Sequence, residues 1–120
     1  MKYTADHEWI KLEGDIATVG ISTHAAGQLG DVVYVELPEI DAEFDKGDDA
    51  AVVESVKAAS EIYAPIGGTI TAVNEALEDA PETVNAAPET DGWFFKMKVS
   101  DASELDGMMD EAAYKKFIED

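Results

Sequence analysis

The chain of 120 residues has no cysteine and no arginine. The absence of cysteine excludes a disulfide framework, a zinc–thiolate site and a thiol nucleophile. All eight basic residues are lysines, and 27 aspartates and glutamates outnumber them, which gives a formal net charge of −19. A negative field of this size repels phosphate backbones and anionic lipid headgroups. We therefore expect neither nucleic acid nor a membrane among the partners.

Long apolar runs and targeting signals are also missing. No stretch approaches the ~20 apolar residues that a membrane-spanning helix needs. Residues 1–9 form neither an apolar signal core nor an arginine-rich amphipathic segment. A length of 120 residues with 46% hydrophobic residues fits one globular domain and is too small for a two-domain enzyme. We expect a single domain over residues 1–120, monomeric and cytoplasmic.

Short alternating or β-branched runs recur along the chain and are typical of strands. These runs cover residues 7–12, 16–21, 32–37, 50–56, 61–63, 69–73 and 93–99. The turns between them contain Gly14, Gly47 and the pair Gly67 and Gly68, where we expect positive φ angles. The pattern predicts a mainly β fold in which two short antiparallel sheets close into a flattened barrel-sandwich.

Two segments have helical features. Ser22 is placed to cap a short helix near residues 22–29, and an apolar stripe that includes Leu105, Met109 and Phe117 predicts a C-terminal helix over about 103–119. We expect that helix to pack outside the β core. The acidic, alanine-rich stretch 75–90 is predicted to be a surface loop with one helical turn after Ala80.

One lysine has a distinctive setting. Two β runs within residues 52–65 are joined by a short polar reversal, and Lys57 lies near its tip. A lysine at a hairpin tip is accessible from most directions. Taken alone, this position is far more typical of an ordinary solvated turn residue than of a site of covalent modification.

Other kinds of site have little support in the sequence. His7 and His24 are the only imidazoles and fall in different predicted elements, which disfavours a histidine metal site or a Ser-His-Asp triad. The acidic run 41–49 lacks the glycine and glutamate of a calcium loop. We therefore predict a non-catalytic protein without a metal centre.

Several segments of the chain together resemble the H proteins of the glycine cleavage system. The core Glu-Ser-Val-Lys-Ala, residues 54–58, is similar to that of swinging-arm carriers that bear lipoyl or biotinyl groups. Val56 and Ala58 stand where biotinyl carriers usually have methionine. The matching segments, in order, are 7–9, 20–22, 29–33, 35–38, 54–60, 73–77, 84–85 and 92–93. The resemblance implies a lipoyl-domain-like fold.

The resemblance also implies that lipoate is amide-linked to Lys57. In this family the lipoyl group takes the aminomethyl group of glycine from a pyridoxal-phosphate glycine decarboxylase to a tetrahydrofolate-dependent aminomethyltransferase. Dihydrolipoamide dehydrogenase then reoxidises it, and a lipoate ligase or lipoyl transferase attaches it. An alternative role is that of an H-like relay that donates lipoate to other lipoyl enzymes.

Residues around Lys57 gain expected roles from the same resemblance. The segment that the attaching enzyme would recognise consists of Glu54, Ser55, Val56 and Ala58. The cleft that would shield the loaded arm consists of Glu8, Gln28 and Glu61, in which a carboxylate could hold an ammonium group. Gln28 stands where some family members have histidine, so we expect no imidazole role there.

Overall fold

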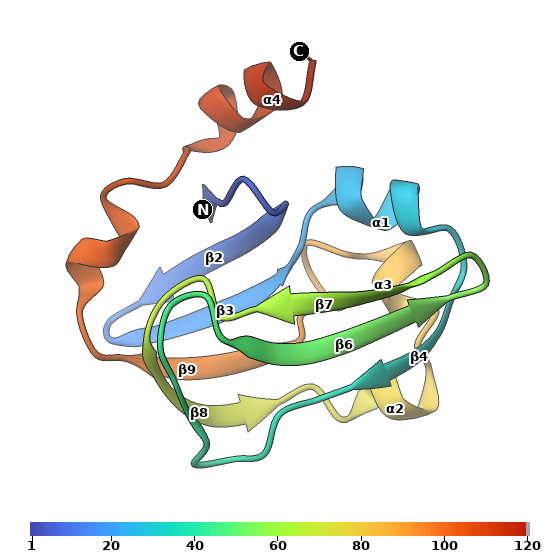
Figure 1. The fold of residues 1–120 in the computed structure, drawn as a ribbon, viewed down its shortest axis with the longest axis horizontal. Coiled ribbons are helices and arrows are strands. Elements are labelled where there is room, and N and C mark those ends of the chain that lie inside the picture. The colour runs from blue at the N-terminus through green and yellow to red at the C-terminus, as the bar shows by residue number, and fades with distance from the viewer. Residues whose placement is uncertain (120) are drawn as a thin grey trace.

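Two antiparallel sheets face each other in the computed structural model, which describes residues 1–119 (Figure 1). The larger sheet contains, in spatial order, β1 (Lys2–Tyr3), β2 (Glu8–Glu13), β3 (Ile16–Ile21), β9 (Phe95–Val99), β8 (Gly68–Val73) and β5 (Glu43–Phe44). The smaller sheet contains β4 (Val32–Glu36), β6 (Asp49–Ser55) and β7 (Ala59–Tyr63). The predicted mainly β fold of two antiparallel sheets is confirmed.

The sheets do not close into a barrel. Within residues 1–119 no ladder joins the smaller sheet to the larger one, and the two edge strands of the larger sheet are only two residues long. Such short edges cannot extend the hydrogen bonding around the molecule. The result is an open, flattened sandwich with principal extents of 36 × 36 × 21 Å.

The core lies between the sheets because side chains alternate in direction along each strand. In β9, the buried Phe95 and Met97 alternate with the outward-facing Lys96 and Lys98. Each large apolar side chain removed from water contributes about 1.5–3 kcal/mol. The inner faces supply Ala17, Val19, Ile70 and Met97 from the larger sheet and Val35, Ala51, Val53 and Ile62 from the smaller one.

The turn glycines follow the prediction at two of three places. Gly14 and Gly47 have φ angles of 64° and 94°. Gly68, in contrast, lies within β8, and its φ is not positive. A Cβ added there would overlap the backbone carbonyl oxygen of Lys98 in β9. At this third turn the prediction of positive φ was wrong, because the glycine allows a close approach of two strands instead.

The predicted short helix is α1 (Thr23–Leu29), and Ser22 caps it by accepting a hydrogen bond from the Ala25 amide at 3.1 Å. The stretch predicted to be a loop contains two short helices. The expected turn after Ala80 is α3 (Thr83–Ala86), whereas α2 (Ala76–Asp79) was not predicted. No helix within residues 1–119 is long and apolar enough to cross a membrane.

The predicted continuous helix over 103–119 is two separate pieces. A 3-10 turn, η1 (Ala102–Leu105), is followed by α4 (Glu111–Glu119). Between them Met109 pairs with Tyr3, each donating its backbone N–H to the other's carbonyl at 3.0 and 2.8 Å. These backbone groups are therefore not available for helical hydrogen bonds, which is why the helix begins only at Glu111.

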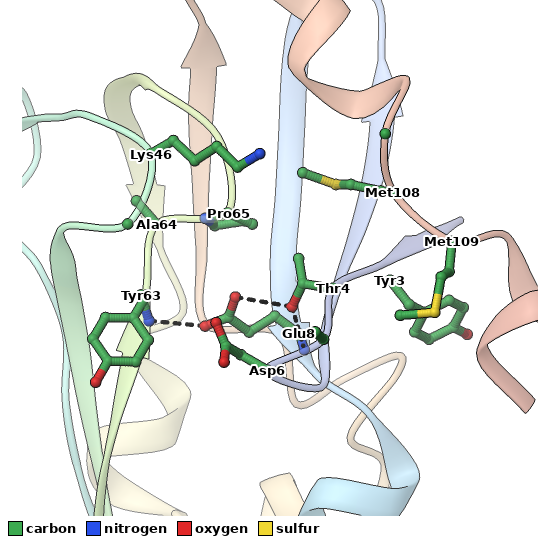
Figure 2. Close-up of a pocket in the computed structure, with 13 residues that line it drawn as sticks. Tyr3, Thr4, Asp6, Glu8, Lys46, Tyr63, Ala64, Pro65, Met108 and Met109 are labelled. Carbon is green, nitrogen blue, oxygen red and sulfur yellow. Dashed lines mark hydrogen bonds between the residues drawn. The ribbon is translucent and has the colours of Figure 1, made fainter. Parts of the chain in front are cut away.

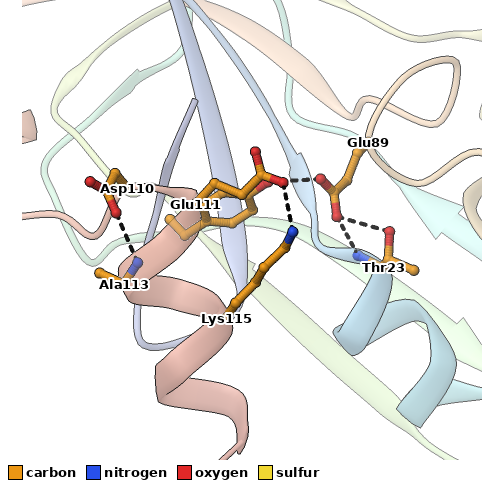
Figure 3. A network of polar contacts seen from close by, with 7 residues as sticks. Thr23, Glu89, Asp110, Glu111, Ala113 and Lys115 are labelled. Carbon is orange, nitrogen blue, oxygen red and sulfur yellow. Dashed lines mark hydrogen bonds and ion pairs between the residues drawn. The ribbon is translucent and has the colours of Figure 1, made fainter.

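Tyr114 fixes α4 to the sandwich. Its ring stacks on Tyr3 with centroids 4.4 Å apart, and its hydroxyl lies 2.7 Å from both His7 Nδ1 and Ser22 Oγ. Tyr3 in turn donates its hydroxyl hydrogen to Glu89 at 2.8 Å, and Glu89 belongs to the polar network beside α4 in Figure 3. The C-terminal helix is thus held by buried aromatic rings and hydrogen bonds.

The acidic surface leads to a prediction about salt. Only two ion pairs, Lys11–Glu13 and Lys115–Glu111, are present in the described part of the chain, and both are exposed. Most carboxylates therefore repel one another without compensation. Because the screening length falls from ~30 Å at 0.01 M salt to ~3 Å at 1 M, we expect the thermal midpoint to rise as NaCl increases to 1 M. A midpoint that falls steadily would show that attractive pairs dominate.

Candidate functional site

The hairpin between β6 and β7 presents Lys57 at its tip, as predicted. Glu54 and Ala59 form the last strand pair, and the Ser55 amide donates to the Ala58 carbonyl at 2.8 Å. Val56 and Lys57 are the two residues enclosed by that bond. Figure 1 shows this connection at the edge of the molecule, next to the end of α1.

Ser55 braces the tip from inside. Its hydroxyl oxygen accepts hydrogen bonds from the backbone amides of Lys57 at 3.2 Å and Ala58 at 3.1 Å. The same hydroxyl donates its hydrogen to the Ala58 carbonyl at 3.1 Å. One donor and two acceptor sites are all that a serine hydroxyl has. The local geometry therefore gives Ser55 a structural reason to be serine.

The turn after α1 braces the tip from outside. The Val56 amide donates to the Asp31 carbonyl at 3.0 Å, and the Lys57 ammonium donates to the Gln28 carbonyl at 3.4 Å. Gly30, with a φ of 76°, lies under the lysine stem, where an added Cβ would come within 2.9 Å of Lys57 Cε. The lysine side chain consequently lies across the end of α1.

The tip is open to a partner. Val56 is 68% exposed, and Lys57, Ala58 and Ala59 are also exposed. Glu54 is an exposed strand-end residue, and neither ion pair found within residues 1–119 includes Lys57. Among residues 1–119 a single long hydrogen bond holds the amine, so it can leave the surface at little cost.

The residues of the predicted cleft are divided between two depressions. Gln28 and Glu61 line a cavity of about 180 Å³. Glu8 does not line this cavity but a larger one of about 480 Å³ (Figure 2). Asp6 contributes to both, so it links the two. The structure therefore brings Gln28 and Glu61 together and places Glu8 beside them in a separate hollow.

Glu8 is a buried carboxyl group with only 2% exposure. One oxygen accepts from the Tyr63 amide at 2.8 Å and the other from the Thr4 hydroxyl at 3.2 Å, as Figure 2 shows. Burial raises the pKa of Glu8 to about 7, and the nearby Asp6 charge adds to the effect, while the two hydrogen bonds oppose it. This carboxyl group can thus change charge near neutral pH.

Sequence reasoning missed most of the larger cavity. Lys46, Met108 and Met109 line it together with Tyr63, and they come from segments that are far apart in the chain. No local sequence motif predicts that these segments lie together. His7 and His24 also come together, with ring centroids 5.0 Å apart. Even so, no group of three residues that could hold a metal ion occurs within residues 1–119.

Comparison with known proteins identifies the family of this chain. The model of the family described as "Glycine cleavage H-protein" matches residues 1–120. The chain belongs to this family. Proteins named "Glycine cleavage system H protein" from Phenylobacterium zucineum and Beijerinckia indica are each 60% identical to the chain, over 118 and 117 residues. Those matches span 98% of this chain and 98% and 94% of the two relatives.

A solved structure agrees in fold. The crystal structure of a glycine cleavage system H protein from Mycobacterium marinum has a TM-score of 0.90, with 34% sequence identity. The match covers 98% of this chain and 95% of that one. Membership of the H-protein family supports a lipoyl-carrier role in glycine cleavage, as a carrier component of that system.

Proposed function

We propose that the chain bears lipoate in amide linkage on Lys57 and shuttles the aminomethyl group of glycine. The donor is a pyridoxal-phosphate glycine decarboxylase and the acceptor a tetrahydrofolate-dependent aminomethyltransferase, with dihydrolipoamide dehydrogenase as the third partner. The observation that carries the proposal is the setting of Lys57 in an H-protein chain. Its amine lies at the tip of a hairpin braced on both sides, and neither described ion pair includes it.

The residues around Lys57 fit an attached lipoyl group. Small, exposed neighbours, Ala58 and Ala59, leave room for an attaching enzyme to approach the amine. When bound, lipoate supplies the sulfur chemistry that carries the one-carbon unit and undergoes reduction and reoxidation. The chain itself supplies a rigid base, which keeps the arm at a high effective concentration near each partner's active site.

Separate roles follow for the other site residues. Glu54, Ser55, Val56 and Ala58 form the surface that a lipoate ligase or lipoyl transferase recognises, and Val56 offers it the most exposed apolar side chain of the tip. Gln28 and Glu61 in the smaller depression and Glu8 in the larger one beside it together shield the end of the arm. Among these, Glu8 is the carboxylate best suited to bind a cationic amine, because it is buried and faces a cavity.

We further propose that the carrier works as a monomer and a single domain in the cytoplasm, without catalytic groups of its own. Mapping the modified residue tests the assignment of Lys57. The full chain is incubated with lipoate ligase, ATP and lipoate, and the adduct is located by peptide mass spectrometry. We expect one adduct, on Lys57. An adduct on any of the other seven lysines would contradict the assignment.

A further inference from the structure

We infer that Asn85 is a positioning residue for Lys57 and acts through the turn formed by residues 30–32. The inference rests on the proposed function, since it concerns how the attaching enzyme recognises the lysine. Asn85 lies 28 positions after Lys57 in the sequence, and its side chain bonds to Gly30 and Val32 rather than to Lys57. The link between them is the turn on which the hairpin tip rests.

The side-chain amide of Asn85 clamps that turn from both sides. Its nitrogen donates to the Gly30 carbonyl at 2.7 Å, and its oxygen accepts from the Val32 amide at 2.9 Å. Only an amide side chain presents a donor and two acceptor lone pairs in one plane at this reach. The neighbouring Val84 is fully buried in the core, so the position of the clamp is fixed by the packing of α3.

The clamped turn contacts the tip directly. Asp31, which lies between the two clamped residues, accepts the hydrogen bond from the Val56 amide at 3.0 Å. Gly30 supports the stem of Lys57 and has a φ of 76°, which few other residues adopt readily. Contacts thus run without a break from Val84 in the core, through Asn85 and the turn 30–32, to the hairpin tip.

Loss of the two Asn85 hydrogen bonds should lower the fraction of chains in which the hairpin tip is correctly placed. Without the amide, the turn samples other conformations, and the Val56 amide loses a fixed acceptor. An enzyme that binds only one tip conformation then has an apparent affinity reduced by the fraction of chains in that conformation. The rate within the bound complex is unaffected, because there the tip is held by the enzyme. The expected signature is a higher KM for the carrier with little change in kcat.

Asn74 provides a matched control in the same region. Its side-chain nitrogen donates to the carbonyl oxygens of Asp91 and Trp93, each at 2.8 Å. Asn74 is 9% exposed. Neither bond involves the hairpin tip or the clamped turn. Asn74→Ala therefore removes a comparable pair of side-chain-to-backbone bonds without touching Lys57.

The experiment compares the full wild-type chain with Asn85→Ala, the near-isosteric Asn85→Asp, and Asn74→Ala. Amide hydrogen exchange at Val56 is measured by NMR, and lipoylation kinetics are measured with lipoate ligase, ATP and lipoate. For both Asn85 variants we expect Val56 to exchange about tenfold faster, which corresponds to about 1.4 kcal/mol of local stability. We also expect a KM about fivefold higher, with kcat within about twofold of wild type.

Asn74→Ala should lower the thermal midpoint about as much as Asn85→Ala does. It should leave the Val56 exchange rate and the KM for the carrier at wild-type values. If the Asn85 variants match Asn74→Ala in both readouts, Asn85 is merely structural and the inference is wrong. Faster exchange with an unchanged KM would also overturn the positioning role. A wild-type chain that accepts no lipoate at Lys57 would instead refute the proposed function, while the exchange rates would still show whether the clamp holds the tip.

Discussion

Lys57→Arg should accept no lipoate and support no glycine cleavage, although it folds normally. Arginine keeps the positive charge and can reach the Gln28 carbonyl that Lys57 contacts. Its guanidinium group, however, is protonated at all accessible pH values and is not an acyl acceptor. The side chain is exposed at the tip, so the substitution should leave the thermal midpoint within about 2 °C of wild type, as expected for a surface change of up to ~0.5 kcal/mol.

Lys46→Arg is the matched control for this result. Lys46 is also exposed in a turn, but it lines the larger cavity and lies at the opposite end of β6 from the tip. Intact-mass spectra after incubation with ligase, ATP and lipoate should show full modification of Lys46→Arg and none of Lys57→Arg. A modified Lys57→Arg chain would mean that the acylated amine lies elsewhere.

Glu8→Gln should make the protein more stable above neutral pH and weaken the dependence of its stability on pH. The pKa of Glu8 is raised by burial from its ordinary 4.5 to about 7. The folded chain therefore binds this proton more tightly than the unfolded chain. Below pH ~4.5 the carboxyl group is neutral in both states, and its contribution to stability is lost as pH rises through about 7.

The size of the effect follows from the same two values. One pKa unit corresponds to about 1.4 kcal/mol, so the buried charge costs about 3 kcal/mol at pH 8. Glutamine avoids that cost, and its amide can still accept from Tyr63 and bond to Thr4. Thermal midpoints should therefore differ by roughly 10 °C at pH 8 and converge toward pH 4.5.

Glu61→Gln controls for the general loss of one negative charge. Glu61 is exposed, and it faces the smaller depression. Its replacement should shift the midpoint slightly and without a comparable pH dependence. If the two variants behave alike between pH 4.5 and 8, burial does not raise the pKa of Glu8.

The sequence predicted the elements whose signal is local. The strand run 16–21 reappears as β3 with identical bounds, and Ser22 caps α1 as expected, because side-chain alternation and a cap hydrogen bond depend on neighbouring residues. The break between η1 and α4 was not predictable in this way. It is imposed by Tyr3, about a hundred positions earlier, which takes the backbone groups of Met109 into a strand pair.

The same distinction applies to the site. The tip position of Lys57 follows from two β runs around a polar reversal, which is local information. Glu8 accepts from the Tyr63 amide and shares its cavity with Met108 and Met109, residues that the chain brings together only in the folded state. A strand-face carboxylate and a buried one look alike in the sequence, so the raised pKa of Glu8 could not be predicted.

Carrier function in glycine cleavage is tested most directly by the first partner reaction. The wild-type chain is lipoylated enzymatically and incubated with a pyridoxal-phosphate glycine decarboxylase, glycine and isotopically labelled bicarbonate, and incorporation of label into the glycine carboxyl group is measured. We predict incorporation that depends on the lipoylated chain and is absent with unmodified wild type or Lys57→Arg. A fully lipoylated chain that supports no more exchange than Lys57→Arg would contradict the carrier role and leave only that of a lipoate relay.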